Sequence, residues 1–172
     1  MRKFTTRDLA RAAMVAAVYT ALTLFLPIPQ YQEVQFRAAE CMTLLPFLFP
    51  WAAPGLIVGC FLSNLLGSPY VLDWIFGTLA TALACWLTER MPNKWLAPLP
   101  PVLCNAVIVG GEIAFSALGG FGLGFWQLYG AMALSVGLGE LAVCCLLGLP
   151  LLSVLPRIRL FRDLIPAKRA AS

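Results

Sequence analysis

Histidine is missing from this chain of 172 residues, and charged residues make up only 12% of it. Without histidine there is no His-based metal site and no serine–histidine pair for nucleophilic catalysis. A GxxxxGK[ST] loop is also missing, so any energy from nucleotide hydrolysis has to come from a partner. The six cysteines lie in apolar stretches without CxxC spacing, which is typical of packing residues. We therefore expect no metal, no cofactor and no enzymatic activity.

The scarcity of charge accompanies a composition that is 60% hydrophobic. Soluble domains carry about 25% charged residues, roughly twice the share found here. The sequence therefore predicts an integral membrane protein, and its length predicts a single membrane domain of packed helices over residues 1–172. The basic N-terminus resembles a signal peptide, but its apolar run continues too far, so we expect it to remain as the first span.

Four apolar stretches are long enough to cross a bilayer, which requires about 20 residues each. They are Leu9–Pro27, Val71–Thr88, Trp95–Leu118 and Phe125–Leu155. A further piece, Cys41–Gly67, contains prolines at positions 46, 50 and 54 and is either one kinked span or two short ones. In the second case the first of the two helices begins near Ala38.

The distribution of lysine and arginine decides between these alternatives. With two spans in the disputed piece there are six helices, and residues 1–8, the 90–94 loop and the tail 157–172 are all cytoplasmic. Every lysine and arginine except Arg37 then lies inside, in agreement with the positive-inside rule. With one span, that loop and the basic tail would lie outside. We therefore predict an all-α bundle of six transmembrane helices with both termini cytoplasmic and residues 29–40 as an extracellular cap.

Acidic and amide side chains recur in the outer half of this predicted bundle. Charged groups within a bilayer are costly and usually mark a functional site. The candidates are Glu40, Asn64, Asp73, Asn105, Glu112 and Glu140. Glu112 and Glu140 have apolar, glycine-rich flanks, so they either contact a ligand or make buried structural hydrogen bonds. With Glu33 included, five carboxylates face the single Arg37, which favours a cation or a molecule rich in N–H donors.

Arg37 itself is either a ligand contact or a counter-ion. If its surroundings are helical, it lies four residues after Glu33 and three before Glu40, on one face. Aromatic residues occur near the same level of the bundle, among them Trp74 and Trp126. They form either an interfacial belt or a stacking wall for a planar ligand.

The first predicted span carries small residues four positions apart. Ala12 pairs with Ala16, and Ala13 pairs with Ala17. Such spacing lets two helix backbones approach closely in lipid. The partner is either another helix of this chain or another subunit.

Four stretches together resemble one known family. They are VQFRAAECMTLLPFLFPWAAPGLIVGCFLSNLLG, DWIFGTLATALA, LPPVLCNAVIVGGEIAF and VGLGELAVCCLLGLPLL, and with the segments between them the similarity runs from about Thr5 to Pro156. In order and spacing they are similar to the QueT family of bacterial substrate-binding (S) subunits of energy-coupling factor transporters. The resemblance implies a six-helix, multi-pass protein of the cell membrane that binds a queuosine precursor, a 7-deazaguanine such as preQ1, preQ0 or queuine.

The resemblance also implies partners and roles. An S subunit works with a transmembrane scaffold subunit and two ATPase subunits, and docks the scaffold through an alanine motif that maps onto Ala12–Ala16 or Ala13–Ala17. We hypothesise that Glu112 or Glu140 reads the guanine-like edge beside Asn64 or Asn105, while Glu40 or Asp73 faces the amine. The alternatives are an S subunit for another cationic or neutral heterocyclic vitamin and a stand-alone secondary transporter. No direct contact with nucleic acid is expected.

Overall fold

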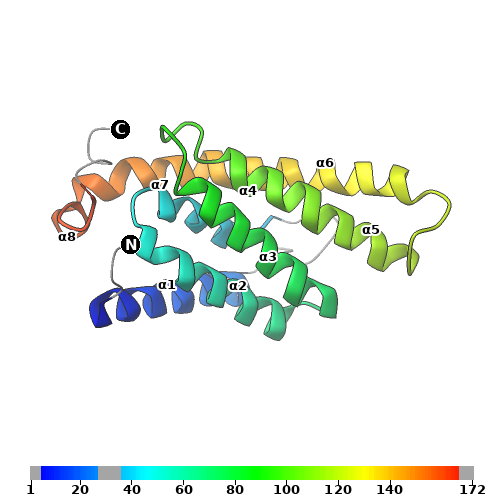
Figure 1. Ribbon diagram of the computed structural model, residues 1–172, viewed down its shortest axis with the longest axis horizontal. Helices are drawn as coiled ribbons and strands as arrows, with labels where there is room; N and C mark the ends of the chain where they lie inside the picture. The colour runs from blue at the N-terminus through cyan, green and yellow to red at the C-terminus, as the bar shows by residue number, and fades with distance from the viewer. Residues whose placement is uncertain (1–4, 27–35, 167–172) are drawn as a thin grey trace.

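The computed structural model describes residues 5–26 and 36–166, and within these ranges the chain contains helices and no strand. The α-helices are α1 (Thr6–Phe25), α2 (Ala53–Gly67), α3 (Val71–Thr88), α4 (Leu99–Cys104), α5 (Gly110–Leu118), α6 (Phe125–Val143), α7 (Leu149–Val154) and α8 (Arg159–Arg162). Short 3₁₀ helices cover Ala38–Phe47, Pro50–Ala52 and Leu155–Arg157, and π-helical turns cover Asn105–Val109 and Cys144–Gly148. Figure 1 shows these elements as one elongated bundle.

Five helical stretches in the described residues are long and apolar enough to cross a membrane. They are Thr6–Phe25, Pro50–Gly67, Val71–Thr88, Leu99–Leu118 and Phe125–Arg157. The prediction of an all-helical membrane protein is therefore confirmed. The fourth stretch begins at Leu99 rather than at Trp95, because residues 95–98 form the turn that leads into it.

The disputed piece is divided into two helical segments that separate at residues 48–49. The first segment, Ala38–Phe47, is a 3₁₀ helix, and nearly all of its side chains are buried. At about 2 Å of rise per residue it extends roughly 20 Å, which is shorter than the ~30 Å hydrocarbon core. Six complete spans therefore remain a prediction.

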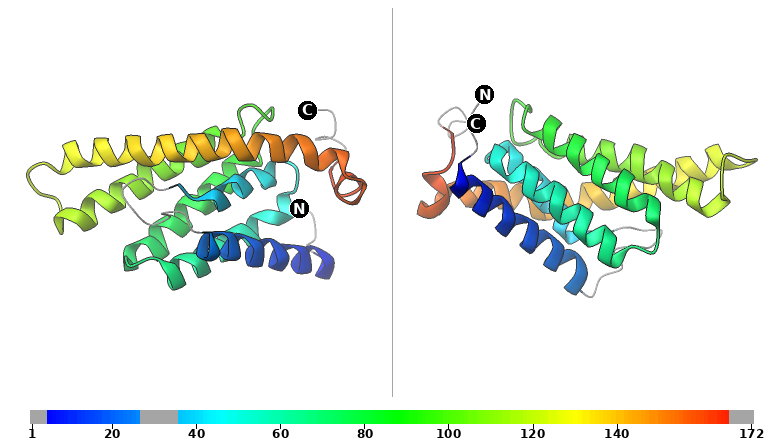
Figure 2. Two further views of the ribbon diagram at one scale, coloured as in Figure 1. Left: turned by 180° about the vertical axis from the view of Figure 1, so that it is seen from behind. Right: turned by 60° about the horizontal axis from the view of Figure 1, so that its bottom comes forward.

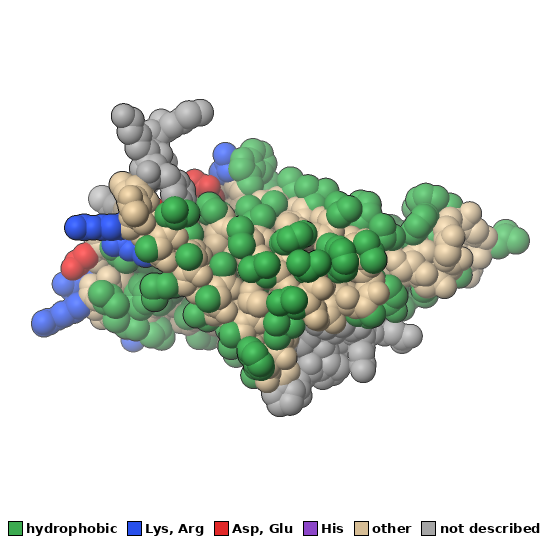
Figure 3. All heavy atoms as spheres, turned by 90° about the horizontal axis from the view of Figure 1, so that it is seen from below, with side chains coloured by type: hydrophobic (Ala, Val, Ile, Leu, Met, Phe, Trp, Pro, Cys, Tyr) green, Lys and Arg blue, Asp and Glu red, His purple; other side chains and the backbone are tan. Residues whose placement is uncertain are grey.

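Both described ends of the chain and the α3–α4 connection lie at one end of the bundle, and the α5–α6 connection lies at the other (Figures 1 and 2). On the face shown in Figure 3, the visible lysine and arginine side chains gather toward the first of these ends. The remaining coloured side chains on that face are mainly hydrophobic. The basic residues therefore segregate along the bundle as expected, while the side that each end faces remains a prediction.

Helices α1 and α2 pack closely because both present small residues at the contact. A Cβ added to Gly55 would meet the backbone of Ala12, and one added to Gly59 would lie 2.9 Å from the carbonyl oxygen of Ala16. Thr20 Oγ1 donates a hydrogen bond of 3.1 Å to the carbonyl of Gly59. Helix α1 begins with a capping box in which Thr5, the residue before Thr6, is the N-cap.

Candidate functional site

Seven of the predicted site residues are buried in the interior, with at most 6% of each residue exposed. They are Arg37, Glu40, Asn64, Asp73, Asn105, Glu112 and Glu140. The two predicted tryptophans differ from this set, because Trp126 is 76% exposed and Trp74 is only partly buried. Ionisable side chains are almost never buried without a compensating partner, so the partners of each one define what this region can do.

Arg37 lies just before the 3₁₀ helix Ala38–Phe47, and its guanidinium reaches two neighbouring helices. One of its terminal nitrogens donates to Asp73 Oδ2 at 3.0 Å, and the other donates to Asn64 Oδ1 at 3.2 Å. Its backbone is extended (φ −90°, ψ 98°), so the assumption that it shares a helical face with Glu33 and Glu40 is wrong for Arg37. Glu33 lies outside the described residues. Arg37 therefore joins α2 to α3.

Asn64 and Asp73 are further fixed by their own surroundings. The Asn64 amide nitrogen donates to the backbone carbonyl of Asp73 at 3.0 Å. A Cβ on Gly77 would lie 2.7 Å from that amide nitrogen and 2.8 Å from Asp73 Oδ1. The lack of a side chain at Gly77 therefore leaves room for the Asn64 amide and the Asp73 carboxylate.

Glu40 occupies the centre of the buried region. Its Oε1 accepts a hydrogen bond from the hydroxyl of Tyr19, which comes from α1 and is fully buried. Its Oε2 has no hydrogen-bond partner in the described part of the chain. One oxygen of the Glu40 carboxylate is therefore hydrogen-bonded, and the other has no partner among the described residues.

A small cavity lies beside Glu40. It is lined by Arg37, Glu40, Asn105, Val109, Val136 and Glu140. Asn105 hydrogen-bonds Glu140, whose Oε1 also lies 3.6 Å from the thiol sulfur of Cys144. The cavity measures about 10 Å³, which is close to the space for one water molecule.

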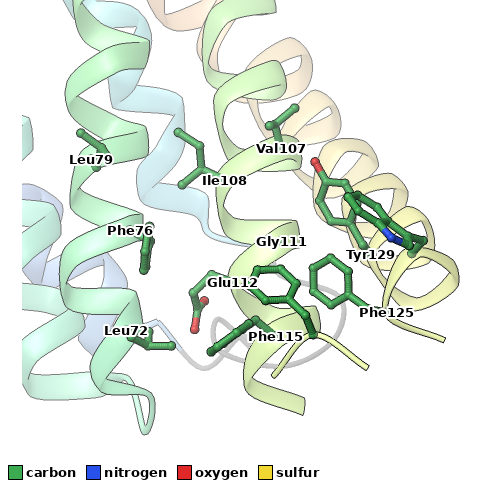
Figure 4. Close-up of a pocket in the computed structure, with 12 residues that line it drawn as sticks. Leu72, Phe76, Leu79, Val107, Ile108, Gly111, Glu112, Phe115, Phe125 and Tyr129 are labelled. Carbon is green, nitrogen blue, oxygen red and sulfur yellow. The ribbon is translucent and has the colours of Figure 1, made fainter. Parts of the chain in front are cut away.

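A much larger groove of about 720 Å³ opens between α3, α5 and α6. Its lining is apolar and rich in aromatic rings, and Glu112 contributes a carboxylate. In Figure 4 this carboxylate lies between Leu72 on α3 and Phe115 on α5, with Phe125 and Tyr129 further to the right. Glu112 Oε1 accepts a hydrogen bond of 2.9 Å from Ser116. Trp126 also lines the groove despite its exposure.

Glu112 and Glu140 each lie within a few residues of a π-helical turn. Asn105 begins the π-helical turn between α4 and α5, and Cys144, four residues after Glu140, begins the one between α6 and α7. Single π turns within α-helices occur frequently at functional sites because they redirect side chains locally. No sequence pattern indicated them.

The predicted alanine pairs face in opposite directions. Ala12 and Ala16 are buried against α2, so they pack within this chain. Ala13 and Ala17 are exposed on the other side of α1.

Sequence reasoning missed Tyr19 as a site residue. The only signal for Tyr19 was that it is one polar aromatic residue on the inward face of an alanine-rich helix.

The fold and the site together define a multi-pass membrane protein with a buried acidic cavity and an aromatic groove. A family model described as QueT transporter matches residues 9–157, and the chain belongs to this family. It is 35% identical over 83 residues to a protein of Lactococcus lactis subsp. cremoris (strain MG1363) named "Queuosine precursor transporter QueT". The match covers 47% of this chain and 48% of that relative, about half of its length. No solved structure matches the chain.

Proposed function

We propose that this protein is the substrate-binding subunit of an energy-coupling factor importer and that it binds a queuosine precursor of the 7-deazaguanine class. The name of the Lactococcus relative supports the substrate, and membership of the QueT transporter family supports transport. In this proposal the chain crosses the membrane six times, with both termini in the cytoplasm. A transmembrane scaffold and two ATPase subunits supply the energy.

The observation that carries the proposal is the excess of buried carboxylates around one neutralised arginine. Arg37 pairs with Asp73, whereas Glu40, Glu112 and Glu140 line a cavity or a groove. Carboxylates accept hydrogen bonds from N–H groups in paired geometry. A deazaguanine offers such donors at its ring amide and exocyclic amine, and preQ1 and queuine add a cationic amine.

The groove supports a position for the ring. Phe115, Phe125 and Tyr129 line it beside Glu112, and aromatic side chains favour stacked or edge-to-face contact with a planar heterocycle. Glu112 is therefore assigned to the guanine-like edge. Asn105 is the preferred amide candidate, because it lines the cavity beside Glu140, whereas the side chain of Asn64 is bonded to both Arg37 and the Asp73 backbone.

The docking of the scaffold is assigned to the outer face of α1. Ala13 and Ala17 are exposed there four residues apart, so a partner helix can approach this surface. Ala12 and Ala16 face α2 instead and are not available to a partner while α1 and α2 are packed.

Calorimetry on the purified protein tests the substrate. We expect preQ1, preQ0 or queuine to bind and thiamine and biotin not to bind. Glu112→Gln should weaken the binding of a deazaguanine by about tenfold or more, because a charged hydrogen bond is lost. Binding of another vitamin in place of the deazaguanines would overturn the proposal, and uptake that persists in cells without the ATPase subunits would indicate a secondary transporter.

A further inference from the structure

Glu40 has a carboxylate oxygen, Oε2, without a hydrogen-bond partner among the described residues, although the residue is only 2% exposed. Its other oxygen accepts the Tyr19 hydroxyl, which fixes the orientation of the carboxylate. Leaving a buried charged oxygen unpaired is costly. Glu40 lines a small cavity, so its unpaired oxygen points to a donor beyond the described residues, a role that a ligand in this cavity can fill.

A second carboxylate serves the same cavity. Glu140 lines it from α6, so the carboxyl groups of two residues serve one small space. Arg37 also lines the cavity, but its guanidinium is bonded to Asp73 and Asn64. Two acids in one confined site favour a bound cation, because a nearby positive charge stabilises the ionised form of each carboxyl group.

The size of each space decides which part of a ligand it can take. The cavity of about 10 Å³ fits a group the size of a water molecule, such as an ammonium group, and not a ring. The groove of about 720 Å³ has room for a bicyclic ring.

One helical stretch contributes residues to both spaces. Asn105 and Val109 line the cavity, and Glu112, three residues further along, lines the groove. Asn105–Val109 is a π-helical turn, and Glu112 lies in the first turn of α5 directly after it. Seven residues at no more than about 1.5 Å of rise each span at most about 10 Å, a length that a fused ring with one short substituent can bridge.

Building on the proposed function, we propose that Glu40 and Glu140 form an ammonium subsite with Tyr19 as its positioning residue. This subsite selects precursors that carry a cationic aminomethyl group at the 7-position over precursors that carry a neutral nitrile there. The ring lies in the groove with its guanine-like edge toward Glu112, and the amine enters the cavity.

Paired ligands test this assignment, because preQ1 and preQ0 share the ring and differ in the 7-substituent. In calorimetry on the full chain in detergent, we expect the wild type to bind preQ1 about tenfold or more tightly than preQ0. Glu40→Gln should lower the affinity for preQ1 by about tenfold and change that for preQ0 by less than about threefold. Glu140→Gln should act in the same direction.

Two further variants distinguish a positioning role of Tyr19 from a nonspecific loss of ligand binding. Tyr19→Phe removes only the hydroxyl and should reduce the preference for preQ1 without abolishing binding of preQ0. Glu89→Gln changes an acid that follows α3, outside the cavity and the groove, and should leave both affinities unchanged.

The subsite is overturned if the wild type binds preQ0 as tightly as preQ1, a result that needs no variant. It is also overturned if Glu40→Gln weakens both ligands equally. In either case the proposed function stands, since both ligands still bind. Binding of neither deazaguanine to the wild type contradicts the proposed function itself.

Discussion

Arg37 and Asp73 form an ion pair in the interior, with 6% and 3% of their side chains exposed. Breaking such a pair leaves one charge buried without compensation, which costs about 3–5 kcal/mol. Arg37→Gln should therefore lower the free energy of unfolding by that order of magnitude. Titration of the detergent-purified protein with sodium dodecyl sulfate measures the change, and adding Asp73→Asn should recover part of the loss.

A second ion pair in the chain provides the matched control. Arg11 lies 3.4 Å from Asp8 near the start of α1, and 32% of the Arg11 side chain is exposed. A partly solvated pair of this kind contributes less than about 1 kcal/mol. If Arg37→Gln proves no more destabilising than Arg11→Gln, the buried pair does not hold α2 and α3 together.

At the residue scale, the sequence identified the buried polar residues and not their pairing. Glu40, Asp73, Glu112 and Glu140 could be found because a charge in an apolar stretch is conspicuous. The pairing of Arg37 with Asp73 could not, because their 36-residue separation is bridged only when the segment that begins at Ala38 packs against α3. Local spacing suggested that Arg37 lies on one helical face with Glu40 and Glu33 instead. That arrangement requires a helix that the backbone at Arg37 does not form.

At the scale of the elements, the contact between α1 and α2 depends on glycine. A Cβ at Gly55 would meet the carbonyl and Cα of Ala12, which are backbone atoms that cannot turn aside. We expect Gly55→Ala to cost about 1–3 kcal/mol through forced separation of the helices. A lower melting temperature of the purified protein is the readout.

Gly130 on α6 is the control for this substitution, because nothing lies within 4 Å of an added Cβ there. Alanine has a higher helix propensity than glycine, so Gly130→Ala should be neutral or stabilising by up to about 1 kcal/mol. Equal effects of the two alanines would mean that the close approach of α1 and α2 contributes nothing.

The elements were predictable where a stretch is uniformly apolar. Val71–Thr88 begins and ends as the sequence indicated, since polar residues and Ser68–Pro69 mark its limits. The 3₁₀ conformation of Ala38–Phe47 and the two π turns were not predictable. These irregularities arise where side chains of different helices meet, and hydrophobic periodicity reports only the average period of a helix.

At the scale of the whole molecule, the basic residues limit the possible arrangements in the membrane. The α3–α4 connection carries Arg90 and Lys94 and lies at the same end as the described termini (Figure 1). The described connection between α5 and α6, residues 119–124, has no charge and lies at the opposite end. A positive-inside orientation then places the α5–α6 connection outside the cell.

Cysteine labelling in intact cells tests this orientation. Leu123 in the α5–α6 connection and Asn93 in the α3–α4 connection are both exposed. A membrane-impermeant maleimide should label Leu123→Cys in intact cells and label Asn93→Cys only after lysis, with the wild-type chain setting the background from its six native cysteines. An odd number of helices lies before the α3–α4 connection if Ala38–Phe47 does not cross the bilayer. The N-terminus would then face the side opposite to that connection and to the C-terminus, and labelling of Asn93→Cys in intact cells, with the N-terminus inside, would establish a single crossing by residues 38–67.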